Sequence, residues 1–207
     1  MTMFSPPIRN LLEFFENNNF SNEVYKHVTR ISNDNYACKY YTDKSFPSAL
    51  KNHNSSPLKI FHTNIRSLQL HSFELYNYLE ILNCQFDVIL VTELGKPNIG
   101  FVESIFKGYT LYYQESDTSK GGGDLIKTSS FDSVTLFEGN KFNLVKKCDC
   151  EKCKFENVWL KLTSAGQEYI IGSIYQHPAG NTQHFVDAFS HILNHAKEKS
   201  FIFGAVI

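Results

Sequence analysis

Apolar and polar residues recur with different periods along the chain, and the change of period divides it into two parts. Residues 1–57 are rich in Asn, Ser, Lys and Tyr, with a helix expected after Ser5 and another near residues 23–31. Residues 51–57 (KNHNSSP) form a polar segment without an apolar anchor. We therefore expect a partly helical or disordered N-terminal extension over residues 1–57 and a folded domain over residues 58–207.

The domain opens with a pattern typical of a β-α-β unit. Residues 58–62 predict a strand, and residues 87–92 form a nearly continuous apolar run, typical of a strand buried on both faces. Between them, a helix is predicted over residues 73–82, with its apolar face formed by Phe73, Tyr76, Leu79 and Leu82. Later strands are predicted at 109–114, 123–128, 131–137, 156–163, 168–175 and 201–206, with a helix at 182–198. The pattern as a whole predicts an α/β fold.

Composition and charge narrow the class of protein. Of 207 residues, 42% are hydrophobic and 14% aromatic, which predicts a packed core and argues against a disordered chain. The formal net charge of −1 argues against nucleic-acid binding by bulk positive charge. No segment approaches the roughly 20 apolar residues of a membrane span, and the N-terminus lacks a signal-peptide core. We therefore expect an intracellular protein without a membrane partner.

Polar side chains that could take part in catalysis or metal binding fall at the ends of predicted strands, where α/β folds usually have their active sites. Asn64 and Glu93 each close a predicted strand, and their oxygen atoms are of the kind that Mg²⁺ binds. Tyr175 closes a later strand, where its hydroxyl could donate to a phosphate oxygen. Each has a structural alternative, which the sequence leaves open: a helix-capping turn at Asn64, a solvated glutamate at Glu93, and a sheet-edge tyrosine at Tyr175.

A cysteine cluster raises a separate hypothesis. Cys148, Cys150 and Cys153 lie within six residues, but a structural zinc site needs four ligands, and a fourth is missing nearby. A solvated loop between strands is therefore the preferred interpretation, with zinc binding as the alternative. The total of five cysteines is odd and unevenly spread, which argues against a disulfide framework.

The order of the segments is more specific than any one of them. LKIFHTNIRSL, FDVILVTEL, GGGDLI, VWLKL and YIIGSIYQHP follow one another along the chain. In this order they resemble the endonuclease/exonuclease/phosphatase family, and within it the apurinic/apyrimidinic-type endonuclease domain of non-LTR retrotransposons. The resemblance covers about residues 36–207. It implies a four-layer α/β sandwich, with two mixed sheets face to face and helices outside.

The resemblance also implies a reaction and its residues. The family hydrolyses phosphodiesters with Mg²⁺, and the retrotransposon domains nick target DNA to prime reverse transcription. By this resemblance Glu93 and Asn64 hold the metal, Tyr175 contacts the scissile phosphate, and Arg66 lies near the DNA backbone. DNA is then the expected partner, with a reverse transcriptase domain in a longer polyprotein, and the nucleus is the expected location if the target is chromosomal.

Departures from the family pattern predict impaired activity. The family's Gly-Asp-x-Asn box reads Gly204-Ala205-Val206-Ile207 here, so Ala205 stands where the family has its catalytic Asp. The later Ser-Asp-His box is absent. Losing a positioned acid–base group costs roughly 10²–10⁴-fold in rate. We therefore expect a C-terminally incomplete sandwich and a catalytically impaired fragment. The alternatives are a non-catalytic DNA-binding or decayed module, a phosphoesterase acting on small molecules, and a zinc-binding interaction module.

Overall fold

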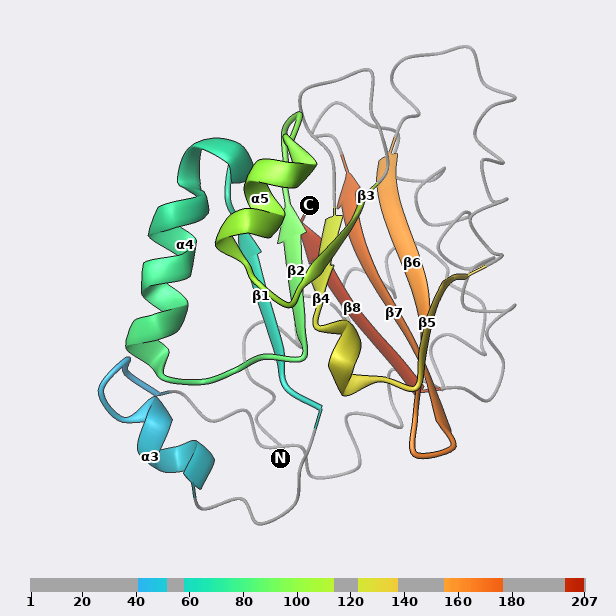
Figure 1. Cartoon of the computed structure of the whole chain (residues 1–207), viewed down its shortest axis with the longest axis horizontal. Coiled ribbons are helices and arrows are strands. Elements are labelled where there is room, and N and C mark those ends of the chain that lie inside the picture. Colours follow the sequence, from blue (N-terminus) through green and yellow to red (C-terminus); the bar gives the residue numbers. More distant parts are fainter. Residues whose placement is uncertain (1–40, 52–57, 114–122, 138–154, 177–199, 207) are drawn as a thin grey trace, which may run out of the picture.

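Two mixed sheets packed face to face form the centre of the protein (Figure 1). The computed structural model describes residues 41–51, 58–113, 123–137, 155–176 and 200–206. Each sheet has four strands in this part of the chain. The predicted α/β sandwich with two sheets is thus confirmed. The helices predicted after Ser5, at 23–31 and at 182–198 lie outside the described residues.

The first sheet has the strand order β1-β2-β4-β3. Its strands are β1 (Ile60–Asn64), β2 (Val88–Thr92), β3 (Thr110–Tyr113) and β4 (Gly123–Ile126). β1 and β2 are parallel, whereas β4 runs antiparallel to both β2 and β3. The predicted β-α-β unit is therefore present, because parallel neighbours need a crossover connection such as the helix between β1 and β2.

The second sheet has the order β5-β6-β7-β8. Its strands are β5 (Ser133–Leu136), β6 (Phe155–Ser164), β7 (Gln167–Gln176) and β8 (Ser200–Val206). β6 is antiparallel to β5 and β7, while β7 and β8 are parallel. The short 3₁₀ helix η1 (Thr128–Ser130) lies between β4 of the first sheet and β5 of the second.

Three α-helices belong to the described part of the chain. They are α3 (Phe46–Lys51), α4 (Leu68–Leu82) and α5 (Ile99–Ile105). The sequence pattern did not predict α3 or α5. At α5, Asn98 is the N-cap, and its side chain accepts a hydrogen bond from the Phe101 N–H (3.1 Å). None of these helices is both long enough and apolar enough to cross a membrane.

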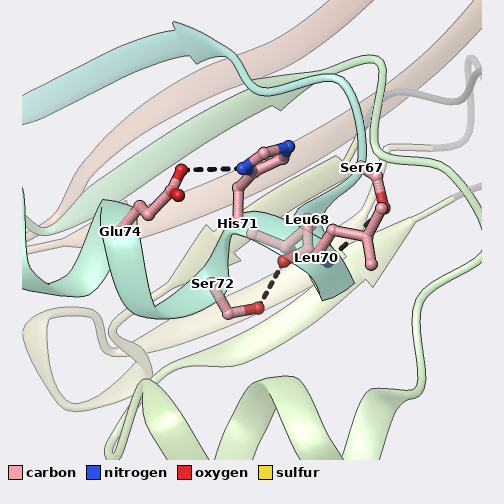
Figure 2. Close-up of polar contacts among 6 residues, drawn as sticks. All are labelled: Ser67, Leu68, Leu70, His71, Ser72 and Glu74. Carbon is pink, nitrogen blue, oxygen red and sulfur yellow. Dashed lines mark hydrogen bonds and ion pairs between the residues drawn. The ribbon is translucent and has the colours of Figure 1, made fainter.

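Helix α4 begins five residues before its predicted start. Ser67 caps it, accepting a long hydrogen bond from the Leu70 N–H (3.5 Å; Figure 2). The predicted apolar face was wrong in two positions, because Phe73 is 60% exposed and Tyr76 is also exposed. The other two predicted positions, Leu79 and Leu82, are buried as expected. The side chains that α4 buries are Leu68, Ser72, Leu75, Leu79 and Leu82.

Strand β2 is buried on both faces, as its apolar run predicts. All five of its residues are buried. One face, with Ile89 and Val91, joins the core under α4 and α5. The other face, with Val88 and Leu90, joins the core between the sheets, whose second-sheet members are Val158, Leu160, Leu162 and Ile171.

Polar contacts link the segment before β2 to the segment before β1 and to η1. One carboxylate oxygen of Asp87 accepts a hydrogen bond from the Lys59 N–H (2.9 Å), and the other accepts one from the Ser130 hydroxyl (2.7 Å). Nearby, the Tyr109 hydroxyl donates to the Phe86 carbonyl. Burial, together with the neighbouring Asp87 carboxylate, raises the pKa of Tyr109 to about 12.

We expect Tyr109→Phe to lower the free energy of unfolding by about 1 kcal/mol at pH 8, the usual value of one hydrogen bond. The raised pKa means that the folded state holds the hydroxyl proton more tightly than the unfolded state does. This stabilisation is complete below the ordinary tyrosine pKa of 10 and disappears as the pH rises toward 12. Urea unfolding at several pH values should therefore show a difference between the proteins that shrinks above pH 10. A constant difference would contradict the assignment.

A glycine in β7 makes room for the one tryptophan of the chain. Gly172 lies opposite Trp159 of β6, and a β-carbon at position 172 would lie within 3.0 Å of three Trp159 ring carbons. We expect Gly172→Ala to cost about 1–3 kcal/mol of stability, because the buried ring would have to move. Gly100→Ala in α5 is the matched control, since its nearest neighbour lies 3.8 Å from the new carbon. Thermal unfolding should show a loss for the first variant and none for the second.

Candidate functional site

The candidate site begins with the parallel pair β1 and β2, whose carboxyl ends meet at one edge of the first sheet. Asn64 is the last residue of β1 and lies opposite Thr92, the last residue of β2. Hydrogen bonds continue past both strands, from the Ser67 N–H to the Glu93 carbonyl (2.8 Å) and from the Leu68 N–H to the Leu94 carbonyl (2.9 Å). The backbone therefore holds Asn64, at the end of β1, close to Glu93, the first residue after β2.

Both loops contain residues in the left-handed region of backbone conformation. Glu93 has φ 55°, Arg66 has φ 52° and Ser67 has φ 110°. Residues other than glycine rarely adopt these values, and such strain clusters at functional sites. Gly95, with φ 77°, allows close approach of the loops, because a β-carbon there would lie 3.4 Å from the Ser67 Cα. The strained geometry therefore surrounds the predicted metal-binding residues.

The predicted residues differ in their exposure. Asn64 and Arg66 are exposed, Glu93 is partly exposed, and Tyr175 is only 3% exposed. Strands β1, β2, β7 and β8 all point toward the same end of the sandwich (Figure 1). Tyr175, near the end of β7, thus lies at the same end as Asn64 and Glu93, but in the facing sheet. Asn64 and Glu93 are adjacent, whereas Tyr175 is buried in the second sheet.

His62 is the titratable residue of β1 that is nearest in sequence to Asn64. Partial burial lowers the pKa of His62 from its ordinary value of 6.5. The imidazole is therefore mostly neutral at pH 7 and adds little positive charge to this end of the sheet. Arg66, which is exposed in the loop after β1, is the cation closest in sequence to Asn64.

The oxygen atoms of Glu93 and Asn64 suit Mg²⁺ better than zinc. Glu93 offers a carboxylate and Asn64 an amide oxygen, which suits Mg²⁺, an ion that keeps several waters and shares its coordination with substrate phosphates. No group of three or more His, Cys, Asp or Glu that could hold a metal occurs within the described ranges. A zinc site with four protein ligands therefore has no counterpart there. The cluster Cys148, Cys150 and Cys153 lies outside them.

Ala205 occupies a position at the same end of the second sheet. In the parallel pair of β7 and β8, Ala205 lies opposite Ile174, and Val206 lies opposite Tyr175. The position at which the resemblance to the family implies an Asp is therefore at the end of the sandwich that holds Asn64 and Glu93. An alanine side chain can neither accept a proton nor orient a water molecule.

The sequence analysis missed two polar residues near this end. Thr92 and Ser173 are both fully buried. They continue the alternation of inward-facing residues in their strands, after Leu90 in β2 and Ile171 in β7. That two-residue period was visible in the sequence, but it does not reveal that the two strands face each other.

Comparison with known proteins gives a result at the level of structure. No protein-family model and no curated protein matches the sequence. Among solved structures, the endonuclease domain of TRAS1, a telomere-specific non-LTR retrotransposon, aligns with a TM-score of 0.51 at 12% identity. An endonuclease/exonuclease/phosphatase family protein from Leptotrichia buccalis gives 0.51 at 14%, and humanized TDP2 of D. rerio gives 0.50 at 17%.

The chain has the endonuclease/exonuclease/phosphatase fold. These alignments cover 72%, 72% and 73% of this chain, in the same order. They span 58% of the TRAS1 domain, 66% of the L. buccalis protein and 62% of TDP2. The chain therefore spans about six tenths of the length of these structurally similar proteins. The predicted fold is confirmed. At these sequence identities, the structural similarity shows the fold alone.

The left-handed conformation of Glu93 leads to a stability prediction for this endonuclease/exonuclease/phosphatase fold. Asn tolerates φ near 55° better than Glu, so Glu93→Asn should raise the free energy of unfolding by up to about 1 kcal/mol. Urea unfolding would measure the gain. Glu80→Asn in α4 is the control, because Glu80 is an exposed residue within a helix and should give no gain. A loss of stability at position 93 would show that the carboxylate itself supports the fold.

Proposed function

We propose that this chain is a DNA-binding, Mg²⁺-dependent phosphodiesterase domain of the retrotransposon endonuclease type, with catalysis impaired at Ala205. The observation that carries the proposal is the position of Asn64 and Glu93 at the neighbouring ends of the parallel strands β1 and β2, where Asn64 pairs with Thr92 and Glu93 follows it. This arrangement lies at the carboxyl ends of strands, where open α/β sheets bind their ligands. It also carries one carboxylate and one amide, the donor types that suit Mg²⁺.

Each residue has a role in the proposed site. Glu93 and Asn64 hold the cation, which when bound stabilises negative charge on phosphate oxygens. Arg66 is exposed and able to contact a backbone phosphate, which positions DNA without reading its sequence. Tyr175 lies at the base of the site, where its hydroxyl donates toward the phosphate. At position 205 no side chain is available to take a proton from the attacking water, so hydrolysis is slow although binding is retained.

DNA is the substrate class that the structural neighbours support. One of them is D. rerio TDP2 complexed with a single-strand DNA product, with a TM-score of 0.50 and 16% identity over 73% of this chain. Because the net charge of this chain is −1, we propose that binding depends on local contacts such as Arg66 rather than on bulk charge. A reverse transcriptase domain in the same polyprotein, acting in the nucleus, is part of this proposal.

A gain-of-function variant tests the proposal directly. We expect the wild-type chain to nick supercoiled plasmid slowly in Mg²⁺, and Ala205→Asp to nick it roughly 10²-fold faster, the usual contribution of a positioned acid–base group. EDTA should abolish the gain. Adding Glu93→Gln to the Ala205→Asp variant should also abolish it. Ala205→Asn is the matched control for size and polarity, because it supplies no proton acceptor of comparable basicity.

Other outcomes favour the alternative functions. Salt-dependent binding of duplex DNA without nicking by either protein would favour a non-catalytic DNA-binding module. Cleavage of soluble phosphomonoesters without cleavage of DNA would favour the small-molecule phosphoesterase. Fast nicking by the wild-type chain would show that position 205 does not limit the rate.

A further inference from the structure

Two hydroxyl groups at the candidate site are buried without a partner. Thr92 and Ser173 are both 0% exposed, and neither Thr92 Oγ1 nor Ser173 Oγ has a hydrogen-bond partner in the described part of the chain. The remaining buried polar residue there, Ser72, is satisfied, because its hydroxyl donates to the Leu68 carbonyl (Figure 2). Buried polar groups are normally hydrogen-bonded, so these two hydroxyls need a physical explanation.

Their positions place both hydroxyls on the inner faces of the sandwich. In β2, Val88 and Leu90 belong to the core between the sheets, and Thr92 continues the same alternation. In β7, Ile171 belongs to that core, and Ser173 continues the alternation there. Cα atoms of β2 lie within 8 Å of Cα atoms of β7, closer than the usual spacing of about 10 Å between packed sheets. The two strands also point the same way (Figure 1).

Both hydroxyls also adjoin the residues of the proposed site. Thr92 precedes Glu93 directly and lies opposite Asn64. Ser173 lies opposite Gly204, which precedes Ala205, and comes two residues before Tyr175 on the same face of β7. Valine at position 92 and alanine at 173 would fill similar space without a polar group to satisfy. Threonine and serine at these positions are therefore costly unless a polar partner lies between the sheets.

We propose that Thr92 and Ser173 are positioning residues, whose hydroxyls together bind one water molecule enclosed between the sheets beneath Glu93. A buried water needs two to four polar partners, and the two hydroxyls supply two of them. Its remaining hydrogen-bonding capacity supports the Glu93 carboxylate, which fixes that side chain for the divalent cation. This role rests on the proposed function, whereas the shared water itself does not.

The first test is the unfolding of the metal-free chain in urea. If the hydroxyls share a water, Thr92→Val and Ser173→Ala should each lower the urea midpoint, and the double variant should lose less than the sum of the two, because either change removes the shared partner. If the hydroxyls are simply unpaired, both variants should raise the midpoint, which would overturn the proposal. Thr135→Val, at an exposed position in β5, controls for the change of side chain.

The second test is the binding of Mn²⁺, a spectroscopic substitute for Mg²⁺, measured by electron paramagnetic resonance. Thr92→Val should weaken Mn²⁺ binding roughly tenfold or more, as loss of a group that orients a metal ligand usually does. Thr92→Ser keeps the hydroxyl and should restore binding, which a purely structural role would not require. Unchanged Mn²⁺ affinity in Thr92→Val would overturn the positioning role.

The two tests separate this inference from the proposed function. If Glu93→Gln binds Mn²⁺ as well as the wild-type chain does, or if the wild-type chain binds none, the proposed metal site is wrong and the positioning role is wrong with it. The urea midpoints then still decide whether the hydroxyls share a water. If Glu93→Gln abolishes binding but Thr92→Val leaves it unchanged, the metal site stands and only the positioning role is wrong.

Discussion

The burial of β2 on both faces determines the arrangement of the rest of the described structure. Every residue of this strand is buried, with the helix layer on one side and the second sheet on the other. Its backbone groups can then be satisfied only by neighbouring strands, which are β1 on one side and β4 on the other. Of these two neighbours only β1 runs parallel to β2, so these two adjacent strands end side by side, and Asn64 and Glu93 lie at that edge of the sheet.

This edge is held by the backbone rather than by side chains. The contacts between the loops after β1 and β2 run from N–H groups to carbonyls, at Ser67 with Glu93 and Leu68 with Leu94. The side chains of Asn64, Arg66 and Glu93 are therefore not needed to join the loops. A strained backbone at Glu93 and Arg66 persists because the surrounding hydrogen bonds fix it. Such an arrangement leaves these side chains available for a ligand.

Local periodicity accounts for what the sequence predicted well. The runs at β1, β2 and β7 have apolar centres, so their strands and the polar residues at their ends followed from the pattern. The start of α4 was missed because its first turn, after Ser67, mixes polar and apolar residues. The choice of Phe73 as a core residue then assigned the wrong face of the helix to the core. α5 is only seven residues long and holds a single buried residue, Val102, so its pattern is weak.

The parts of the site that were missed depend on contacts between distant segments. Thr92 and Ser173 are 81 residues apart in sequence, and nothing in either segment alone indicates that their strands face each other. The close approach of β2 and β7 is a property of the sheet packing, to which residues from both sheets contribute. Periodicity can therefore assign a residue to one face of its strand, but it cannot identify the residue on the facing strand.

Position 205 separates the requirements of the fold from those of the chemistry. The pairing of β8 with β7 uses backbone groups, so it is compatible with either alanine or aspartate at that position. The loop edge that carries Asn64, Arg66 and Glu93 belongs to the other sheet and does not depend on position 205. Under the proposed function, Ala205 stands where the family has its catalytic Asp. The proton acceptor is therefore missing, while the edge with Asn64, Arg66 and Glu93 remains in place. Cation binding and hydrolysis are then separable in this chain, because the proposed cation ligands belong to the first sheet and position 205 belongs to the second.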